Sequence, residues 1–241
     1  MYHRHIVRDH FALLDRPVWT ALTTEQSHLA SRMGSACAFP EEIGPLAAAA
    51  SQAHGDMRDF NALIWHRSTP LITLETRSPI CSEFLLAEDP LAVLQMLATS
   101  LIQTPSTHEI EMLGPEDSEQ IFDLALRTKP GPFARKTNLL GEFMGVRREG
   151  QLIAMAGQRL RLPGFVEISA VCVDAPYRGQ GIGAALVRQM ADRILSSGDT
   201  PFLHTYASNT QAISLYQQLG FEIRASLEAT VWARNAMVQD P

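Results

Sequence analysis

The segment from Val171 to Leu186, VCVDAPYRGQGIGAAL, constrains the fold of this chain more than any other stretch. Its first residues continue an apolar strand pattern, and helical spacing then runs through Ile182, Leu186, Met190 and Ile194 until Ser197-Gly198 closes it. Backbone N–H groups at the start of a helix lack partners inside the helix, and glycine lets an anion approach them closely. The loop between strand and helix therefore predicts a pyrophosphate cradle at Gly179, Gly181 and Gly183.

The pattern around this loop excludes two common phosphate-binding folds. No Gly-Lys-Ser/Thr follows, so it is not a Walker loop. The apolar runs at 143–148, 152–161 and 165–173 are joined by turns at Glu149-Gly150-Gln151 and Leu162-Pro163-Gly164, which predicts an antiparallel meander. Dinucleotide-binding glycine loops follow βαβ units instead. Nucleotide hydrolysis and hydride transfer are both disfavoured.

A second segment, NTQAISLYQQLGF at residues 209–221, predicts another short helix. Ser208 or Asn209 is the expected N-cap and Gly220 the expected C-terminal glycine. Strands are expected on both sides, at 202–206 and 221–224, and a final strand at 227–234. An earlier strand at 109–113 and a helix entered through Gly114-Pro115 and ending near Arg127 complete a mixed α/β unit.

Together these two segments resemble the GNAT superfamily of acyl-CoA-dependent N-acetyltransferases. Residues 178–183, RGQGIG, are similar to its Arg/Gln-x-x-Gly-x-Gly/Ala acyl-CoA loop, and residues 209–221 to its Asn-x-x-Ala-x-x-Leu-Tyr-x-x-x-Gly-Phe motif. The resemblance covers about residues 108–234. It implies an α/β fold with a mixed (α+β) sheet, acetyl-CoA as co-substrate without a metal, and direct transfer of the acetyl (acyl) group to a primary amine in a ternary complex.

The resemblance also assigns contacts with the co-substrate. The amides of residues 178–183 are expected to bind its pyrophosphate, strand edges at residues 171–173 its pantetheine arm, and the Val173 amide its thioester oxygen. The expected cofactor-binding set is Val171, Cys172, Val173, Arg178, Gly179, Gln180, Gly181, Ile182, Gly183, Ala184, Asn209 and Tyr216. Asn209 either hydrogen-bonds the cofactor or only caps its helix.

Two side chains are expected to be catalytic. By resemblance Tyr216 is the general acid that protonates the leaving thiolate, with packing beneath the sheet as the alternative. Glu167 matches a catalytic glutamate of some members, and burial in a cleft would raise its pKa enough for it to act as base. Alternatively Glu167 orients the acceptor's ammonium or pairs with Arg159, and His204 is then the other candidate base.

The N-terminal part carries weaker signals. We expect residues 1–105 to form a separate α/β region and residues 106–241 the acyltransferase domain, with Thr104 to Thr107 as the linker. Alanine content predicts a helix at Leu46–Ala53, and alternation predicts a strand at Leu71–Thr76. Its length would allow a degenerate copy of the same fold, as in the glycine N-acyltransferase-like branch, although it lacks an Arg-Gly-x-Gly counterpart.

Composition and charge limit the classes of partner that this chain is expected to contact. A formal charge of −6 and a pI near 5.7 disfavour nucleic acid. The apolar stretch at 91–102 is shorter than the ~20 residues of a membrane span, and the first residues lack the apolar run of a secretory signal. We therefore expect a cytoplasmic monomer or homodimer that contacts no membrane. The alternative to an enzyme is a catalytically inactive acyl-CoA sensor or interaction protein.

Cysteines and histidines give no metal-site pattern. Cys37, Cys81 and Cys172 are scattered, which favours a reducing compartment. Cys172 is expected to be buried and inert, with an acyl-cysteine route left open. His3, His5 and His10 cluster near the N-terminus without a further ligand pattern, so no metal is expected there.

Overall fold

The structure, a computed structural model, describes residues 10–76, 85–102 and 107–235. The chain divides into two compact units. Unit 1 comprises Met1–Glu41, Pro45–Val93 and Ala225–Pro241, and unit 2 comprises Glu42–Gly44 and Leu94–Arg224. This division differs from the expected boundary at residue 105, because the end of the chain belongs to unit 1. Part of the expected linker, together with His3, His5 and Cys81, lies outside the described residues.

Unit 2 contains a mixed sheet whose strands follow the order β6-β11-β10-β9-β8-β7. β10 and β11 run parallel. β8, β9 and β10 form an antiparallel meander, as the turns predict, and β7 adds to β8 in antiparallel fashion. Its strands are β6 (Leu91–Leu97, in unit 2 from Leu94), β7 (Glu111–Leu113), β8 (Phe143–Arg148), β9 (Gln151–Leu162), β10 (Phe165–Val173) and β11 (Thr200–Tyr206). Its helices are η2 (Pro115–Asp117), α4 (Ser118–Thr128), η3 (Thr137–Leu140), η4 (Ala175–Tyr177), α5 (Ile182–Ser196) and α6 (Thr210–Gln218).

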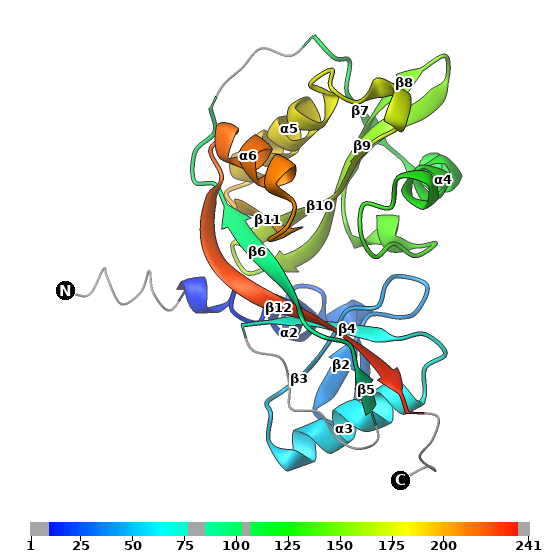
Figure 1. Cartoon of the computed structure of the whole chain (residues 1–241), viewed down its shortest axis with the longest axis vertical. Coiled ribbons are helices and arrows are strands. Elements are labelled where there is room, and N and C mark those ends of the chain that lie inside the picture. Colours follow the sequence, from blue (N-terminus) through cyan, green and yellow to red (C-terminus); the bar gives the residue numbers. More distant parts are fainter. Residues whose placement is uncertain (1–9, 77–84, 103–106, 236–241) are drawn as a thin grey trace, which may run out of the picture. The chain divides into compact units, whose positions relative to one another are not determined.

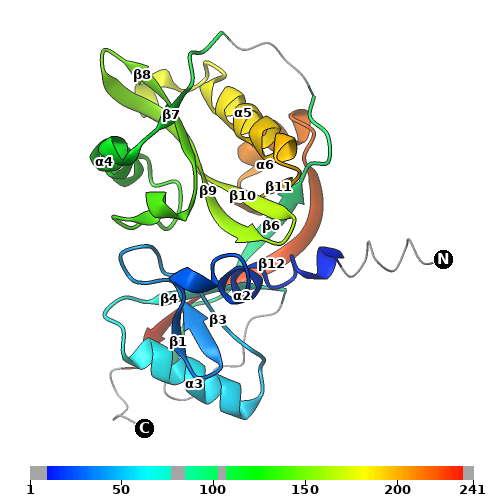
Figure 2. The ribbon, with the colours of Figure 1, turned by 180° about the vertical axis from the view of Figure 1, so that it is seen from behind.

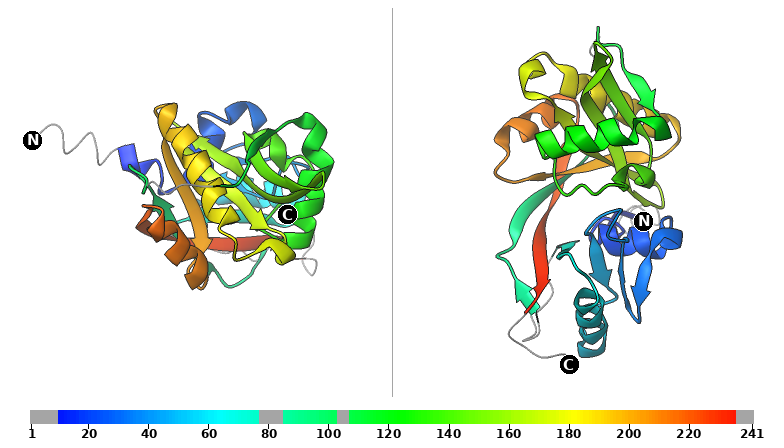
Figure 3. Two further views of the ribbon diagram at one scale, coloured as in Figure 1. Left: turned by 90° about the horizontal axis from the view of Figure 1, so that it is seen from above. Right: turned by 90° about the vertical axis from the view of Figure 1, so that its right-hand side faces the viewer.

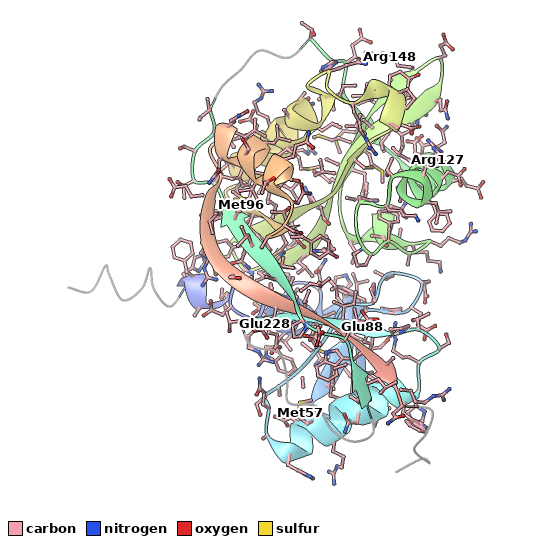
Figure 4. The ribbon with its side chains drawn as sticks, viewed as in Figure 1. Met57, Glu88, Met96, Arg127, Arg148 and Glu228 are labelled. Carbon is pink, nitrogen blue, oxygen red and sulfur yellow. The ribbon has the colours of Figure 1, made fainter. Side chains whose placement is uncertain are left out.

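Helices cover both faces of this sheet. α5 and α6 lie on one face and α4 on the other (Figure 1 and Figure 2). The larger core, on the α5 side, includes Met96, Val166 and Leu186, while the smaller core, on the α4 side, includes Leu124 and Phe143. In Figure 4, the labelled Met96 of β6 belongs to the core on the α5 side of the sheet, and the labelled Arg127 belongs to α4 on the other side.

The central strands β10 and β11 part along their length. Their pairing runs from Phe165 opposite Thr200 to Ile168 opposite Leu203 and stops there, although β10 continues to Val173. Just beyond the last pair, the register of β10 against β9 shifts between Ser169 and Cys172. Ala170 in this bulge has a φ of 54°, a left-handed conformation that alanine rarely adopts. The bulge redirects β10 where it leaves β11.

Unit 1 holds a second, three-stranded sheet, and α3 packs against it (Figure 3). Buried aromatic residues Phe60 and Trp232 meet edge to face in its core, and the Trp232 indole N–H donates to the Thr73 hydroxyl at 2.9 Å. The elements are α2 (Pro17–Thr23), η1 (Ser27–Leu29), β1 (Ser31–Met33), β2 (Ala36–Ala38), β3 (Ala47–Ala49), α3 (His54–Trp65), β4 (Leu71–Glu75), β5 (Leu85–Ala87) and β12 (Glu222–Arg234, in unit 1 from Ala225).

Two sequence-based assignments are corrected. The alanine-rich stretch Leu46–Ala53 is not a helix: Ala47–Ala49 forms the fully buried strand β3, paired with β2. Alanine's helix propensity is a weak preference, which burial between a neighbouring strand and a packed helix overrides. The two predicted C-terminal strands are one strand, β12, which pairs in unit 1 with β4 and β5. The predicted strand at 71–76 is confirmed as β4.

Among the described residues, no helix has both the length and the apolar character needed to cross a bilayer.

Candidate functional site

The loop between β10 and α5 has the geometry that its glycines predict. Gly179 and Gly181 both have a φ of 77°, in the left-handed region where glycine carries no steric penalty. A Cβ added to either glycine would meet no atom within 4 Å, so the space beside both is open. Gly181 is the N-cap of α5, and residues 178–181 are exposed.

The amides of this loop are unpaired. From Gly179 to Ala184, no backbone N–H donates a hydrogen bond to any residue that the structure describes, and the first bond of α5 runs from the Ala185 amide to the Gly181 carbonyl at 3.0 Å. Unpaired N–H groups at a helix start, together with the helix dipole, favour a bound anion. This loop can therefore hold a phosphate group with main-chain donors alone.

The end of β10 presents a second row of main-chain groups. The Val173 carbonyl accepts a hydrogen bond from Arg178 Nε at 3.0 Å, so it points away from β9. In an extended strand the N–H and C=O of one residue point to the same edge, which turns the Val173 amide toward the side where β11 has parted. Val171 and Val173 are only partly buried and pack against the core that carries α5.

Hydrogen bonds of Asp174 fix the position of the chain where it enters the glycine loop. Asp174 Oδ1 accepts from the Ala175 amide at 3.0 Å, and Arg127 at the end of α4 donates to its Oδ2 at 3.2 Å. The Asp174 amide in turn donates to the Ile153 carbonyl of β9 at 2.8 Å. The residue that precedes the loop is therefore anchored to both β9 and α4.

Tyr216 lies on α6 with its side chain in the core of the α5 face, only 8% exposed, and its ring is tilted against Phe221. Burial raises the pKa of Tyr216 to about 12, so the phenol keeps its proton at neutral pH. The structure therefore shows the ring of Tyr216 packed in the core, which was the alternative role expected from the sequence. Its role as a general acid stays a prediction. Asn209 caps α6, because its Oδ1 accepts from the Ala212 amide at 3.1 Å.

Glu167 is the centre of a buried polar network at the last paired rungs of β10 and β11. Arg159 on β9 donates to both of its oxygens, at 2.9 Å and 2.6 Å, and His204 Nδ1 lies 2.7 Å from Oε1. Its carboxylate is 0% exposed. The alternative expected from sequence, pairing with Arg159, is therefore present.

Hydrogen bonding sets the direction of this network. Arg224 donates to Gln95 Oε1 at 2.9 Å, which turns the Gln95 amide nitrogen toward His204 Nε2, 3.1 Å away. An N–H donor facing Nε2 makes that ring nitrogen the acceptor, so Nδ1 carries the proton that is donated to Glu167. The side chains form one chain of donors ending on a carboxylate.

The expectation of a raised pKa for Glu167 is wrong. Burial alone would raise the pKa of Glu167, but the Arg159 guanidinium and the His204 imidazole lower it to about 2. A carboxylate held so strongly in its ionised form is a poor acceptor of a proton at neutral pH. His204 is also enclosed, since both of its ring nitrogens have partners and its side chain is 4% exposed. Both groups are thus engaged within the buried network, and the role of either as a general base stays a prediction.

Gln95 and Arg224 were missed from the sequence. A single polar residue inside the apolar run of β6 is a signal that a buried partner exists, but nothing in a sequence shows which strand supplies it. Cys172 is buried as expected, and burial raises its pKa to about 11, which disfavours the reactive thiolate. Within the described ranges, no group of three or more His, Cys, Asp or Glu side chains is arranged to hold a metal.

Comparison with known proteins gives a consistent assignment. The FR47-like protein family matches residues 143–233. A crystal structure from Novosphingobium aromaticivorans, described as belonging to the GNAT family, is 36% identical with a TM-score of 0.84, over 92% of this chain and 99% of that one.

Two curated relatives match shorter segments. N-alpha-acetyltransferase RimI of Mycobacterium tuberculosis is 36% identical over 83 residues, and mycothiol acetyltransferase of Mycolicibacterium vanbaalenii is 35% identical over 80 residues. The matches cover 33% and 31% of this chain, and the chain spans only 51% and 27% of the length of these relatives.

The first prediction concerns the buried ion pair. Replacing Arg159 with Met leaves Glu167 charged and without its main partner, which should lower the free energy of unfolding by about 3–5 kcal/mol. The control is Arg161→Met on the same strand, whose exposed pair with Asp199 should be worth less than about 1 kcal/mol. Urea unfolding followed by circular dichroism measures both, and equal losses would contradict a structural role for the buried pair.

The second prediction concerns pH. Because the pKa of Glu167 is lowered from 4.5 to about 2 in the folded protein, its stabilisation is fully present above pH 4.5 and is lost as the pH falls toward 2. The shift corresponds to about 3 kcal/mol. The wild-type protein should therefore lose about that much more stability over this range than Glu167→Gln, which has no carboxyl there to titrate. Parallel pH profiles for the two proteins would refute the lowered pKa.

Proposed function

The chain belongs to the GNAT family of acetyltransferases, and from that premise we propose that it transfers the acetyl group of acetyl-CoA to a primary amine. The observation that carries the proposal is the run of unpaired amides from Gly179 to Ala184, where the exposed loop enters α5. Diphosphate is the charged part of coenzyme A that such a run fits.

The parted strands supply the rest of the binding path. Beyond Ile168 the edge of β10 is no longer paired with β11, so its main-chain groups are available to the amide-containing pantetheine arm. Val171 and Val173 add partly exposed apolar surface beside it. In this proposal the Val173 amide, on the open edge, donates to the thioester oxygen and stabilises the negative charge that develops there.

The proposed chemical step balances without a covalent enzyme intermediate. The amine nitrogen forms a bond to the thioester carbon, the carbon–sulfur bond breaks, and the electron pair leaves on sulfur. Tyr216, whose phenol is protonated at neutral pH, gives its proton to the thiolate as the carbon–sulfur bond breaks. The nitrogen loses one proton to water, and a proton from water restores the phenol. Glu167 and His204 take no proton in this scheme, since both are engaged in the buried network.

The part of the chain that is similar to the two curated relatives does not identify which amine is the acceptor. RimI and mycothiol acetyltransferase have names that point to different acceptors, yet each matches a similar share of this chain. Acceptor choice on a shared fold usually resides in loops and flanking elements. We therefore assign the donor side of the reaction to unit 2 and leave the acceptor class at primary amines.

The third prediction tests the proposed function at the loop. The wild-type protein should bind CoA in calorimetric titration and release free thiol from acetyl-CoA with at least one member of a panel of amines. Gly181→Glu should abolish both, because it puts a carboxylate at the phosphate cradle.

The matched control is Gly150→Glu in the β8–β9 turn. Gly150 has a φ of 78° and open space beside it, so this substitution introduces a similar strain and the same charge away from the loop. Unchanged CoA affinity in Gly181→Glu, or equal loss in both variants, counts against the proposal. CoA binding without thiol release from any amine would favour an acyl-CoA sensor.

The fourth prediction separates the two roles of Tyr216. Tyr216→Phe keeps the ring that packs against Phe221 and removes only the hydroxyl. If the phenol is the acid, kcat should fall by about 10²–10⁴-fold while the Kd for CoA stays within about two-fold. Steady-state kinetics and calorimetry on the same preparation measure the two quantities. A parallel loss of both would make Tyr216 a packing residue.

A further inference from the structure

His108 contacts the phosphate-binding loop from a distant part of the sequence. Its Nε2 lies 2.9 Å from the carbonyl oxygen of Gln180. A carbonyl oxygen only accepts, so Nε2 carries the proton and donates it. Ile110, two residues on, packs against the core to which Ile182 of α5 also belongs, so this segment is anchored to the same core as the helix that follows the loop. All four residues belong to unit 2.

This contact sets the orientation of one peptide group in the loop. The Gln180 carbonyl and the Gly181 amide belong to the same planar peptide, and the described chain contains no cis peptide bond. In a trans peptide the C=O and N–H point in opposite directions. Holding the Gln180 oxygen toward His108 therefore turns the Gly181 N–H away from it, where it is among the unpaired amides of the loop.

The loop needs such a restraint because of its composition. Gly179 and Gly181 flank Gln180, both with positive φ, and glycine has the largest conformational freedom to lose on ordering. The Gln180 side chain is exposed, and a Cβ at either glycine would find no neighbour, so packing does little to fix the peptide. An external hydrogen bond reduces the entropy that anion binding would otherwise cost.

We propose that His108 is a positioning residue for acyl-CoA, whose Nε2–H holds the Gln180 peptide so that the Gly181 amide is directed at the diphosphate before the ligand arrives. This inference rests on the proposed function and adds to it a residue outside both sequence motifs. His108 acts through the loop, and it does not touch the reacting atoms.

The experiment compares His108→Ala with His108→Gln. Losing one solvent-exposed hydrogen bond should raise the Kd for CoA by about three- to ten-fold in His108→Ala, measured by calorimetry. Glutamine places an N–H donor at a similar distance along its side chain, so His108→Gln should stay within about two-fold of wild type. His54→Ala, which removes an exposed imidazole at the start of α3, is the matched control and should leave the Kd unchanged.

A second readout separates positioning from general stability. Pantetheine has the arm of CoA but no diphosphate, so its affinity should be the same in wild type and His108→Ala. In turnover, the KM for acetyl-CoA should rise in His108→Ala while kcat is kept. An unchanged Kd for CoA in His108→Ala, equal weakening of CoA and pantetheine, or failure of glutamine to restore binding would each overturn the inference.

Failure of the inference and failure of the proposed function give different results. Wild-type protein that binds no CoA would overturn both. Wild-type protein that binds CoA and releases its thiol, with His108→Ala indistinguishable from it, would overturn the inference alone.

Discussion

The site in unit 2 depends on main-chain N–H groups that the protein itself leaves unsatisfied. Amides without a partner occur at Gly179 to Gly181, which are exposed, and at Ile182 to Ala184, which form the first turn of α5, where helix geometry leaves N–H groups unpaired. Gly179 and Gly181 both have positive φ within this stretch, and Asp174 anchors the end of the strand just before it. In the proposed function, these main-chain donors hold the diphosphate of coenzyme A.

The charged residues buried among the central strands of the sheet have a different role, because they link these strands to one another. Arg159, Glu167 and His204 link β9, β10 and β11 at the last rungs where β10 and β11 still pair. A buried, fully hydrogen-bonded ion pair of this kind is costly to break and favours one arrangement of its strands. We interpret it as the fixed end from which β10 and β11 diverge, with the bulge at Ala170 directing β10 outward.

Local sequence patterns predicted some parts of the fold and the site correctly and others incorrectly. The bounds of β8 and β10, the helix after the glycines and the cap at Asn209 follow from local patterns, and the structure confirms them. Glu167 was misjudged because a pKa depends on which charges surround the group, and its partners come from β9 and β11. The strand at Ala47–Ala49 was taken for a helix because propensity does not include burial.

The sequence alone therefore determined the family, the glycine loop before α5 and the two motif helices, since each is encoded within about a dozen consecutive residues through glycine conformation, capping and helical periodicity. Only the tertiary structure decided that Glu167 is ionised and enclosed, that Gln95 and Arg224 complete its network, and that His108 reaches the Gln180 carbonyl. The contacting residues are far apart in the sequence. His204 and Glu167 are 37 positions apart, and Arg224 and Gln95 are 129 positions apart. Hydrogen bonds over such separations are set by how strands align, and local patterns do not contain that information.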